Sequence, residues 1–164
     1  MKIMIKNFLF ILLIFISTPS FTYELDGIWQ EDVDKTIQWN KTNRIVEEEY
    51  LKKMGAIMGH MWISYSEGDW CLFNEPYEHN YSGKKTAAPR FDTSFGKYKI
   101  LAENEYGYVI ESSFKNDHKN IEMIVFESDD SLYAHSLTTE DFGQPGSRVY
   151  FKRVAPVKWS FDCE

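Results

Sequence analysis

The side chains best suited to hold an acidic group are Arg148 and Tyr150, two residues apart in the segment "SRVYFKRV". Successive side chains of a strand point to opposite faces, so Arg148 and Tyr150 share one face and Val149 and Phe151 share the other. If the first pair faces the interior, it can hold a carboxylate by charge-assisted hydrogen bonds. If the apolar pair faces the interior, the usual case for a half-buried strand, Arg148 and Tyr150 face outward. A β-bulge would change the register partway, so both arrangements stay open.

No catalytic residue, metal site or cofactor is predicted. The chain has no nucleophile motif such as G-x-S-x-G, and the acidic run 47–49 is typical of a solvated helix start. Four histidines are present, none at metal-ligand spacing from a Cys, Asp or Glu: His60, His79, His118 and His135. We therefore expect a protein that binds rather than catalyses.

Aromatic residues make up 16% of the chain and supply candidate ligand contacts. Trp62 and Tyr108 are predicted to contact a ligand together with Arg148 and Tyr150. The aromatic side chains that either line an apolar cavity or fill it are Trp29, Trp62, Trp70, Tyr65, Tyr106, Tyr108 and Phe126. A barrel of about eight strands lies between a packed interior and a one-ligand cup, so the sequence leaves both open.

Strand-like segments follow one another from residue 60 to residue 154. The segments "HMWISYSE", "WCLFNE", "GKYKILAENE", "YGYVIESSFK", "KNIEMIVFES", "SLYAHSLTT" and "SRVYFKRV" are mostly separated by short joints rich in turn residues. With the strand around Trp29, they number about eight. Such spacing predicts an all-β fold: a closed or nearly closed antiparallel up-and-down barrel, because closure removes the exposed edges of a meander.

Two segments interrupt the meander. After the first strand, residues 31–43 predict a turn or short helix, and residues 43–59 predict a helix, because apolar residues recur on one face at Val46, Tyr50, Met54, Ile57 and Met58. The irregular stretch 76–94 predicts an edge strand or a long loop, since prolines and charges weaken pairing there. This stretch carries Tyr77, His79, Tyr81 and Phe91 and is the natural recognition loop.

The first 22 residues have the layout of a secretory signal: a basic start, an apolar run of about ten residues and a small-residue exit. We expect cleavage after Ser20 or Thr22 and a single domain over residues 23–164. Loss of Lys2 and Lys6 changes the formal net charge from −7 to −9. This acidic balance argues against nucleic acid and anionic membrane surfaces as partners, and the apolar run is short for a membrane span.

The two cysteines, Cys71 and Cys163, suggest one disulfide in an exported protein. Such a bond would pin the C-terminal tail to the body of the protein. The alternative is two free thiols.

The layout resembles the calycin superfamily of lipocalins and fatty-acid-binding proteins. The similarity rests on Gly27-Ile28-Trp29 in the first strand, on the segment 147–154 in the last, and on the helices after strand one. It implies that the Trp29 indole plugs one end of the barrel and packs on a cation from the far end of the fold, for which Arg153 is the candidate. It also implies that Arg148 and Tyr150 match the pair with which the fatty-acid-binding branch holds a ligand carboxylate.

Together these features predict an exported, periplasmic or secreted, monomeric lipocalin-like protein. In the first interpretation it carries a small apolar or amphipathic ligand in the barrel. In the second it is an inhibitor or immunity protein that binds an enzyme through its loops, and its acidic charge would suit a basic partner.

Overall fold

The computed structural model describes residues 23–74, 76–81, 83–88, 94–114, 119–137 and 147–155. The helices are α1 (Val33–Thr42) and α2 (Glu48–Ile57). The strands are β1 (Gly27–Glu31), β2 (Met61–Ser66), β3 (Asp69–Asn74), β4 (Tyr77–Tyr81), β5 (Lys84–Ala88), β6 (Ser94–Asn104), β7 (Gly107–Phe114), β8 (Lys119–Ser128), β9 (Ser131–Ser136) and β10 (Val149–Ala155). Among the described helices, neither is long and apolar enough to cross a membrane.

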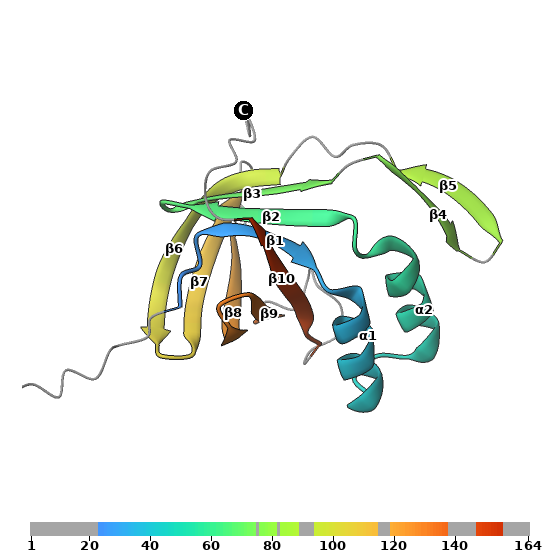
Figure 1. Cartoon of the computed structure of the whole chain (residues 1–164), viewed down its shortest axis with the longest axis horizontal. Helices are drawn as coiled ribbons and strands as arrows, with labels where there is room; N and C mark the ends of the chain where they lie inside the picture. The colour runs from blue at the N-terminus through green and yellow to red at the C-terminus, as the bar shows by residue number, and fades with distance from the viewer. Residues whose placement is uncertain are drawn as a thin grey trace, which may run out of the picture.

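Eight antiparallel strands form a closed barrel in the order β1-β10-β9-β8-β7-β6-β3-β2 (Figure 1). Most neighbours in space are also neighbours in the chain, so the connections run up and down. The step from β3 to β6 skips β4 and β5, which pair only with each other. The predicted all-β barrel with a helical insertion after strand one is therefore confirmed, and the irregular stretch 76–94 contributes a separate hairpin.

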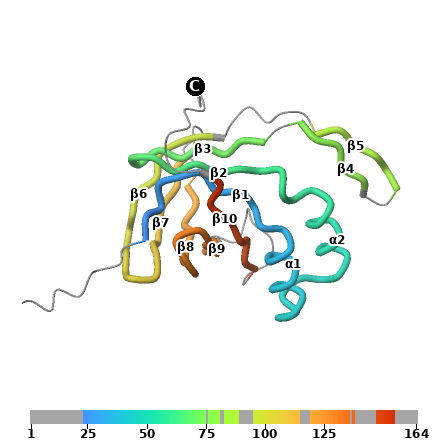
Figure 2. Tube along the Cα trace, in the orientation of Figure 1, coloured from blue at the N-terminus to red at the C-terminus, as the bar shows by residue number. Residues whose placement is uncertain are grey.

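Both helices lie at one end of the barrel, and the β4–β5 hairpin projects beyond the barrel on the same side (Figure 2). The hairpin is attached to α2, since the Tyr77 hydroxyl donates to the Ile57 carbonyl at 3.2 Å. The Tyr77 ring also stacks on His60, with 3.9 Å between the ring centroids. The face of β4 that carries Tyr77 is thus turned toward the body of the protein.

Helix α1 takes over the hydrogen bonding to the edge of β10 at the point where β1 ends. The helix starts at the N-cap Asp32, whose carboxylate accepts from the Lys35 amide at 3.1 Å. One turn apart on its buried face, Thr36 Oγ1 accepts from the Tyr150 amide at 2.9 Å, and Asn40 Nδ2 donates to the Arg148 carbonyl at 2.8 Å. Because β1 pairs with β10 only from residue 151 onward, these side chains satisfy backbone groups that would otherwise lack a strand partner.

A plug of aromatic and charged groups closes the other end of the barrel. The Trp29 side chain is 0% exposed, and the Arg153 guanidinium lies 4.3 Å from its ring centroid. Arg153 also donates to the carbonyls of Glu24, Asp26 and Asp129 at 2.5, 2.7 and 2.9 Å. The stacked pair expected from the calycin resemblance is thus present, and it fixes the chain before β1 to both β10 and the β8–β9 turn.

Replacing Arg153 by methionine should therefore destabilise the barrel. The variant keeps an apolar stem but loses the cation–π contact and three charge-assisted hydrogen bonds, so we expect the free energy of unfolding to fall by about 1.5–3 kcal/mol. Urea unfolding followed by tryptophan fluorescence measures the change. Lys152→Met is the matched control, because it removes the same charge from an exposed neighbour. It should change stability by less than about 0.5 kcal/mol, and equal losses in the two variants would contradict the role of Arg153.

Candidate ligand-binding cavity

The half of the lumen nearer the helices holds a cavity of about 450 Å³. Seven of the eight barrel strands, all but β6, contribute side chains to its lining, and so does α2. The lining residues are Trp29, Glu31, Tyr50, Met54, Ile57, Met58, Met61, Ile63, Tyr65, Trp70, Leu72, Ser112, Phe114, Asn120, Glu122, Ile124, Leu132, Ala134, Ser147, Val149 and Phe151. Most of these side chains are apolar, as is typical of small-molecule sites.

The floor of the cavity is part of the main hydrophobic core. Trp29, Ile124 and Leu132 are buried there, and below them Phe126 meets the Trp29 ring edge-on with 5.8 Å between centroids. The plug therefore fills the lumen only at its far end. The sequence left open whether the lumen is filled by side chains or holds a cavity. In the structure one end of the lumen is packed and the other end holds the cavity.

Helix α2 covers part of the cavity at the opposite end. Its side chains Met54 and Ile57 face the lumen together with Met58, and they pack in a satellite cluster that includes Leu51. Tyr50 lines the same space while remaining 40% exposed, so the cavity reaches the surface beside α2. Methionine side chains are flexible and polarizable, and they adapt to ligands of irregular shape.

The polar part of the wall lies on β7 and β8. Ser112 and Asn120 are directly opposite each other in the strand register, and Asn120 Nδ2 donates to Glu122 Oε1 at 3.0 Å. Burial raises the pKa of the Glu122 carboxyl to about 7, because low-dielectric surroundings disfavour the charged form. A hydroxyl, an amide and a carboxyl thus converge on one side of a mainly apolar space.

A second carboxyl, that of Glu31, enters from β1, four strands away from β7 in the closed order and hence across the lumen. Its side chain is 5% exposed, and Oε2 accepts from the Gly59 amide at 2.7 Å. Burial raises the pKa of Glu31 to about 7, although hydrogen bonds from the Gly59 and Met61 backbone act in the opposite direction. Glu31 therefore fastens the turn between α2 and β2 at the rim of the cavity.

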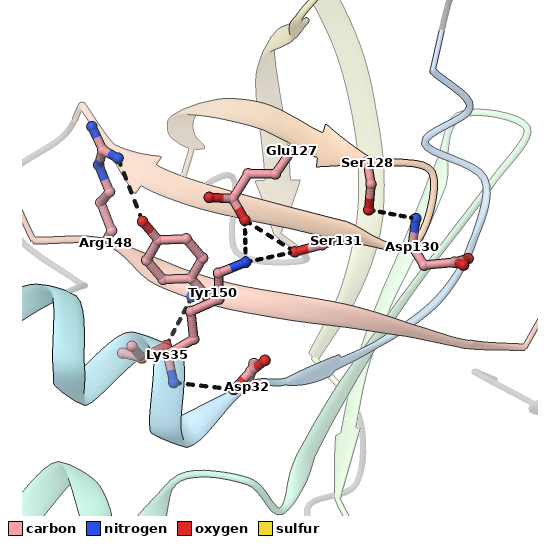
Figure 3. A network of polar contacts seen from close by, with 9 residues as sticks. Asp32, Lys35, Glu127, Ser128, Asp130, Ser131, Arg148 and Tyr150 are labelled. Atoms are coloured by element: carbon pink, nitrogen blue, oxygen red, sulfur yellow. Dashed lines mark hydrogen bonds and ion pairs between the residues drawn. The ribbon is translucent and has the colours of Figure 1, made fainter.

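Arg148 and Tyr150 lie outside the lumen, on the outer face of β10 (Figure 3). Arg148 stacks between Trp39 of α1 and Tyr133 of β9, at 4.3 and 4.1 Å from the ring centroids. Tyr150 is buried beneath α1, with the ammonium of Lys35 5.1 Å from its ring centroid. Of the two arrangements that the sequence left open, the structure has the outward one: Val149 and Phe151 face the lumen, and Arg148 and Tyr150, predicted to contact a ligand, instead contact α1 and do not line the cavity.

Further contacts hold α1 against this outer face. Lys35 forms an ion pair with Glu127 of β8 and donates to Ser131 Oγ at 3.1 Å (Figure 3). Ser131 Oγ in turn donates to Glu127 at 3.1 Å. The group is partly exposed and joins α1 to β8 and β9 as well as to β10.

Trp62 and Tyr108, the other two predicted ligand contacts, also lie away from the cavity. Trp62 is on the outer face of β2 and stacks on Phe73 of β3 with 5.8 Å between centroids. Tyr108 belongs to the packed end, where its hydroxyl donates to the Tyr23 carbonyl. Contrary to the prediction, neither residue therefore lines the cavity. The reason is the same for both: the sequence did not determine which face of each strand is inward or how far along the lumen a residue lies.

Sequence reasoning missed both lumen carboxyls. Glu122 shares a face with Ile124 and Phe126 in a period-two pattern, which is the one signal that could have placed it inward. Glu31 shares a face with Trp29 in the same way. Both were overlooked because acidic residues are abundant in this chain and are usually exposed.

The remaining predictions concern metals and the disulfide. Among the described residues no group of three or more His, Cys, Asp or Glu side chains is arranged to hold a metal ion. Cys71 is buried in β3 beside Ile28 and Phe73. Cys163 lies outside the described residues, so the Cys71–Cys163 disulfide stays a prediction.

No protein-family model, curated protein or solved structure matches the chain. The resemblance to calycins therefore continues to rest on the residues and the architecture described above.

The buried Glu31 carboxyl should make stability depend on pH. Because its pKa is raised from 4.5 to about 7 in the folded state, the folded protein binds the proton more tightly than the unfolded chain. The stabilisation is fully present below about pH 4.5 and is lost as pH rises through about 7. Between about pH 5 and about pH 8 the free energy of unfolding of the unmodified protein should therefore fall. We expect this fall to be smaller in Glu31→Gln by about 1–3 kcal/mol, since one pKa unit is about 1.4 kcal/mol.

Urea unfolding at the two pH values measures this difference. Glu103→Gln, which removes the same charge from an exposed site on β6, should retain the pH dependence of the unmodified protein. If Glu31→Gln retains it as well, the buried carboxyl is not the source.

Proposed function

We propose that this protein is a lipocalin-like binding protein that holds a small, mainly apolar ligand in the lumen of its barrel. The observation that carries the proposal is the cavity of about 450 Å³. Ligand pockets typically enclose about 300–1,000 Å³ and combine an apolar lining with a few convergent polar groups. Here the floor and α2 supply the apolar surface, and Ser112, Asn120 and Glu122 supply the polar groups.

The architecture supports binding at this end of the barrel. An apolar ligand gains free energy by leaving water for an apolar enclosure, at about 25 cal/mol for each Å² removed from water. The strands form a closed wall around this space, and Tyr50 marks where the cavity reaches the surface. A ligand would enter beside α2, where methionine side chains can adjust to it.

The alternative function, an inhibitor or immunity protein, would use the β4–β5 hairpin. In the described part of that hairpin the exposed side chains are polar, charged or small, such as Glu78, Asn80 and Lys84. Tyr77 is turned toward His60 and α2. The side chain of Tyr81 and the whole of Phe91 lie outside the described residues. The lumen therefore has the stronger support as the binding site.

Filling the cavity should abolish binding of an apolar probe. Ala134 lines the lumen from β9, so Ala134→Phe places a ring in the ligand space. We expect the unmodified protein to bind the neutral dye N-phenylnaphthylamine and Ala134→Phe to bind it at least about tenfold more weakly, a difference of about 1.4 kcal/mol. Titration with the dye, followed by its fluorescence, measures both affinities.

Ala102→Phe is the matched control, because it adds the same ring at an exposed position of β6. It should bind the dye as the unmodified protein does. Circular dichroism establishes that each variant is folded before its affinity is compared. Failure of the unmodified protein to bind the dye, or equal binding by a folded Ala134→Phe, would contradict a ligand site in the lumen.

We also propose that the protein is exported to the periplasm or secreted, on the strength of the basic and apolar segment at residues 1–22. That segment lies outside the described residues. The chain recovered from its own host should have an intact mass that lacks residues 1–20 or 1–22. Recovery of only the full-length chain from the cytoplasm would contradict export.

A further inference from the structure

We propose that the cavity selects amphipathic ligands whose polar end is a cationic amine, held at Glu122, and that it disfavours fatty acids and other carboxylates. This inference rests on the proposed function and deepens it, since it names the class of ligand. It reverses the ligand chemistry that Arg148 and Tyr150 suggested from sequence.

The charges that face the cavity are the first reason. Among the described lining residues, the charged side chains are Glu31 and Glu122, and none is a lysine, arginine or histidine. Arg148 lies outside the barrel wall, stacked on Trp39 and Tyr133. A ligand carboxylate would therefore meet two acids in a low-dielectric space with no described cation beside it, and like charges repel strongly there.

The distribution of polarity along the lumen is the second reason. The inward face of β8 carries, from the helix end toward the plugged end, Asn120, Glu122 and Ile124. Glu122 thus lies where the apolar floor of Trp29, Ile124 and Leu132 gives way to polar groups. A ligand with its tail on this floor would bring its polar end to the Glu122 carboxyl.

The two carboxyls differ in how they are already used. The Glu31 carboxylate holds the α2–β2 turn through the Gly59 amide, so we assign it a structural task. The Glu122 carboxylate accepts from the Asn120 amide, and a carboxylate with about four acceptor positions retains room for an ammonium. Tyr65 lies across the lumen and interacts electrostatically with Glu122, but a neutral phenol supplies no cation.

Pairing would remove the cost of a buried charge. An isolated carboxylate in apolar surroundings is strongly disfavoured, which is why burial raises the pKa of Glu122 to about 7. A bound ammonium would favour the ionised carboxylate and form a charge-assisted hydrogen bond with it. Neutral alcohols would gain a weaker hydrogen bond, and carboxylates would gain repulsion.

Three ligands with the same alkyl tail test the proposal: decylamine, decanol and decanoate. Each ligand is titrated, below the concentration at which that ligand forms micelles, into the complex of the unmodified protein with N-phenylnaphthylamine at about pH 8, and displacement of the dye reports its affinity. At this pH most of the Glu122 side chains are ionised and decylamine is cationic. We expect decylamine to bind at least about tenfold more tightly than decanol, and decanoate to bind more weakly than decanol.

Glu122→Gln should remove this preference, so that decylamine and decanol bind within about threefold of each other. The matched control is Glu103→Gln, which changes the net charge equally at an exposed site on β6. It should retain the preference, and this separates a contact at Glu122 from general attraction of cations to an acidic protein.

Each outcome has one meaning. Decanoate binding as tightly as decylamine to the unmodified protein would overturn the amine proposal while the dye still reports a lumen site. An amine preference that survives in folded Glu122→Gln would overturn the assignment to Glu122. No binding of the dye or of any of the three ligands would overturn the proposed function itself. The comparison on the unmodified protein decides the ligand class even if the variant fails to fold.

Discussion

The pairing of β1 with β10, sealed by Arg153 on Trp29, is the constraint on which the rest of the structure depends. These two strands come from opposite ends of the described chain, and their pairing turns a meander into a barrel. The guanidinium lies 4.3 Å from the indole centroid and also binds three backbone carbonyls. Because this plug fills one end of the lumen, the empty space is confined to the end that carries the helices.

The same pairing decides which groups face that space. β1 is shorter than β10, and α1 takes its place against residues 148–150, where Thr36 and Asn40 satisfy the strand backbone. The outward side chains of this segment, Arg148 and Tyr150, are thereby used to dock the helix. While Arg148 and Tyr150 contact α1 on the outer face, Val149 between them faces the lumen. The charged side chains that line the described part of the lumen are therefore carboxyls.

Much of the architecture could be predicted from the sequence, whereas the candidate site could not. Alternation of apolar and polar residues, turn residues at short joints and a helical period over residues 43–59 are local signals that survive in any register. The site depends on register, and a slip of one residue moves every side chain to the other face. Trp62 shows the difficulty, since it lies in a correctly predicted strand yet packs outside the barrel.

The sequence by itself therefore determined the number and order of the barrel strands and the helical insertion, because each follows from periodicity and turn residues, whereas the Trp29–Arg153 pair was implied by the resemblance to calycins. Only the tertiary structure decided that the lumen is packed at one end and empty at the other. It also decided that Glu31 is buried, and Glu122 partly buried, in that lumen. The physical reason is that burial, and with it the raised pKa of a carboxyl, comes from strands far apart in the chain that enclose the group together.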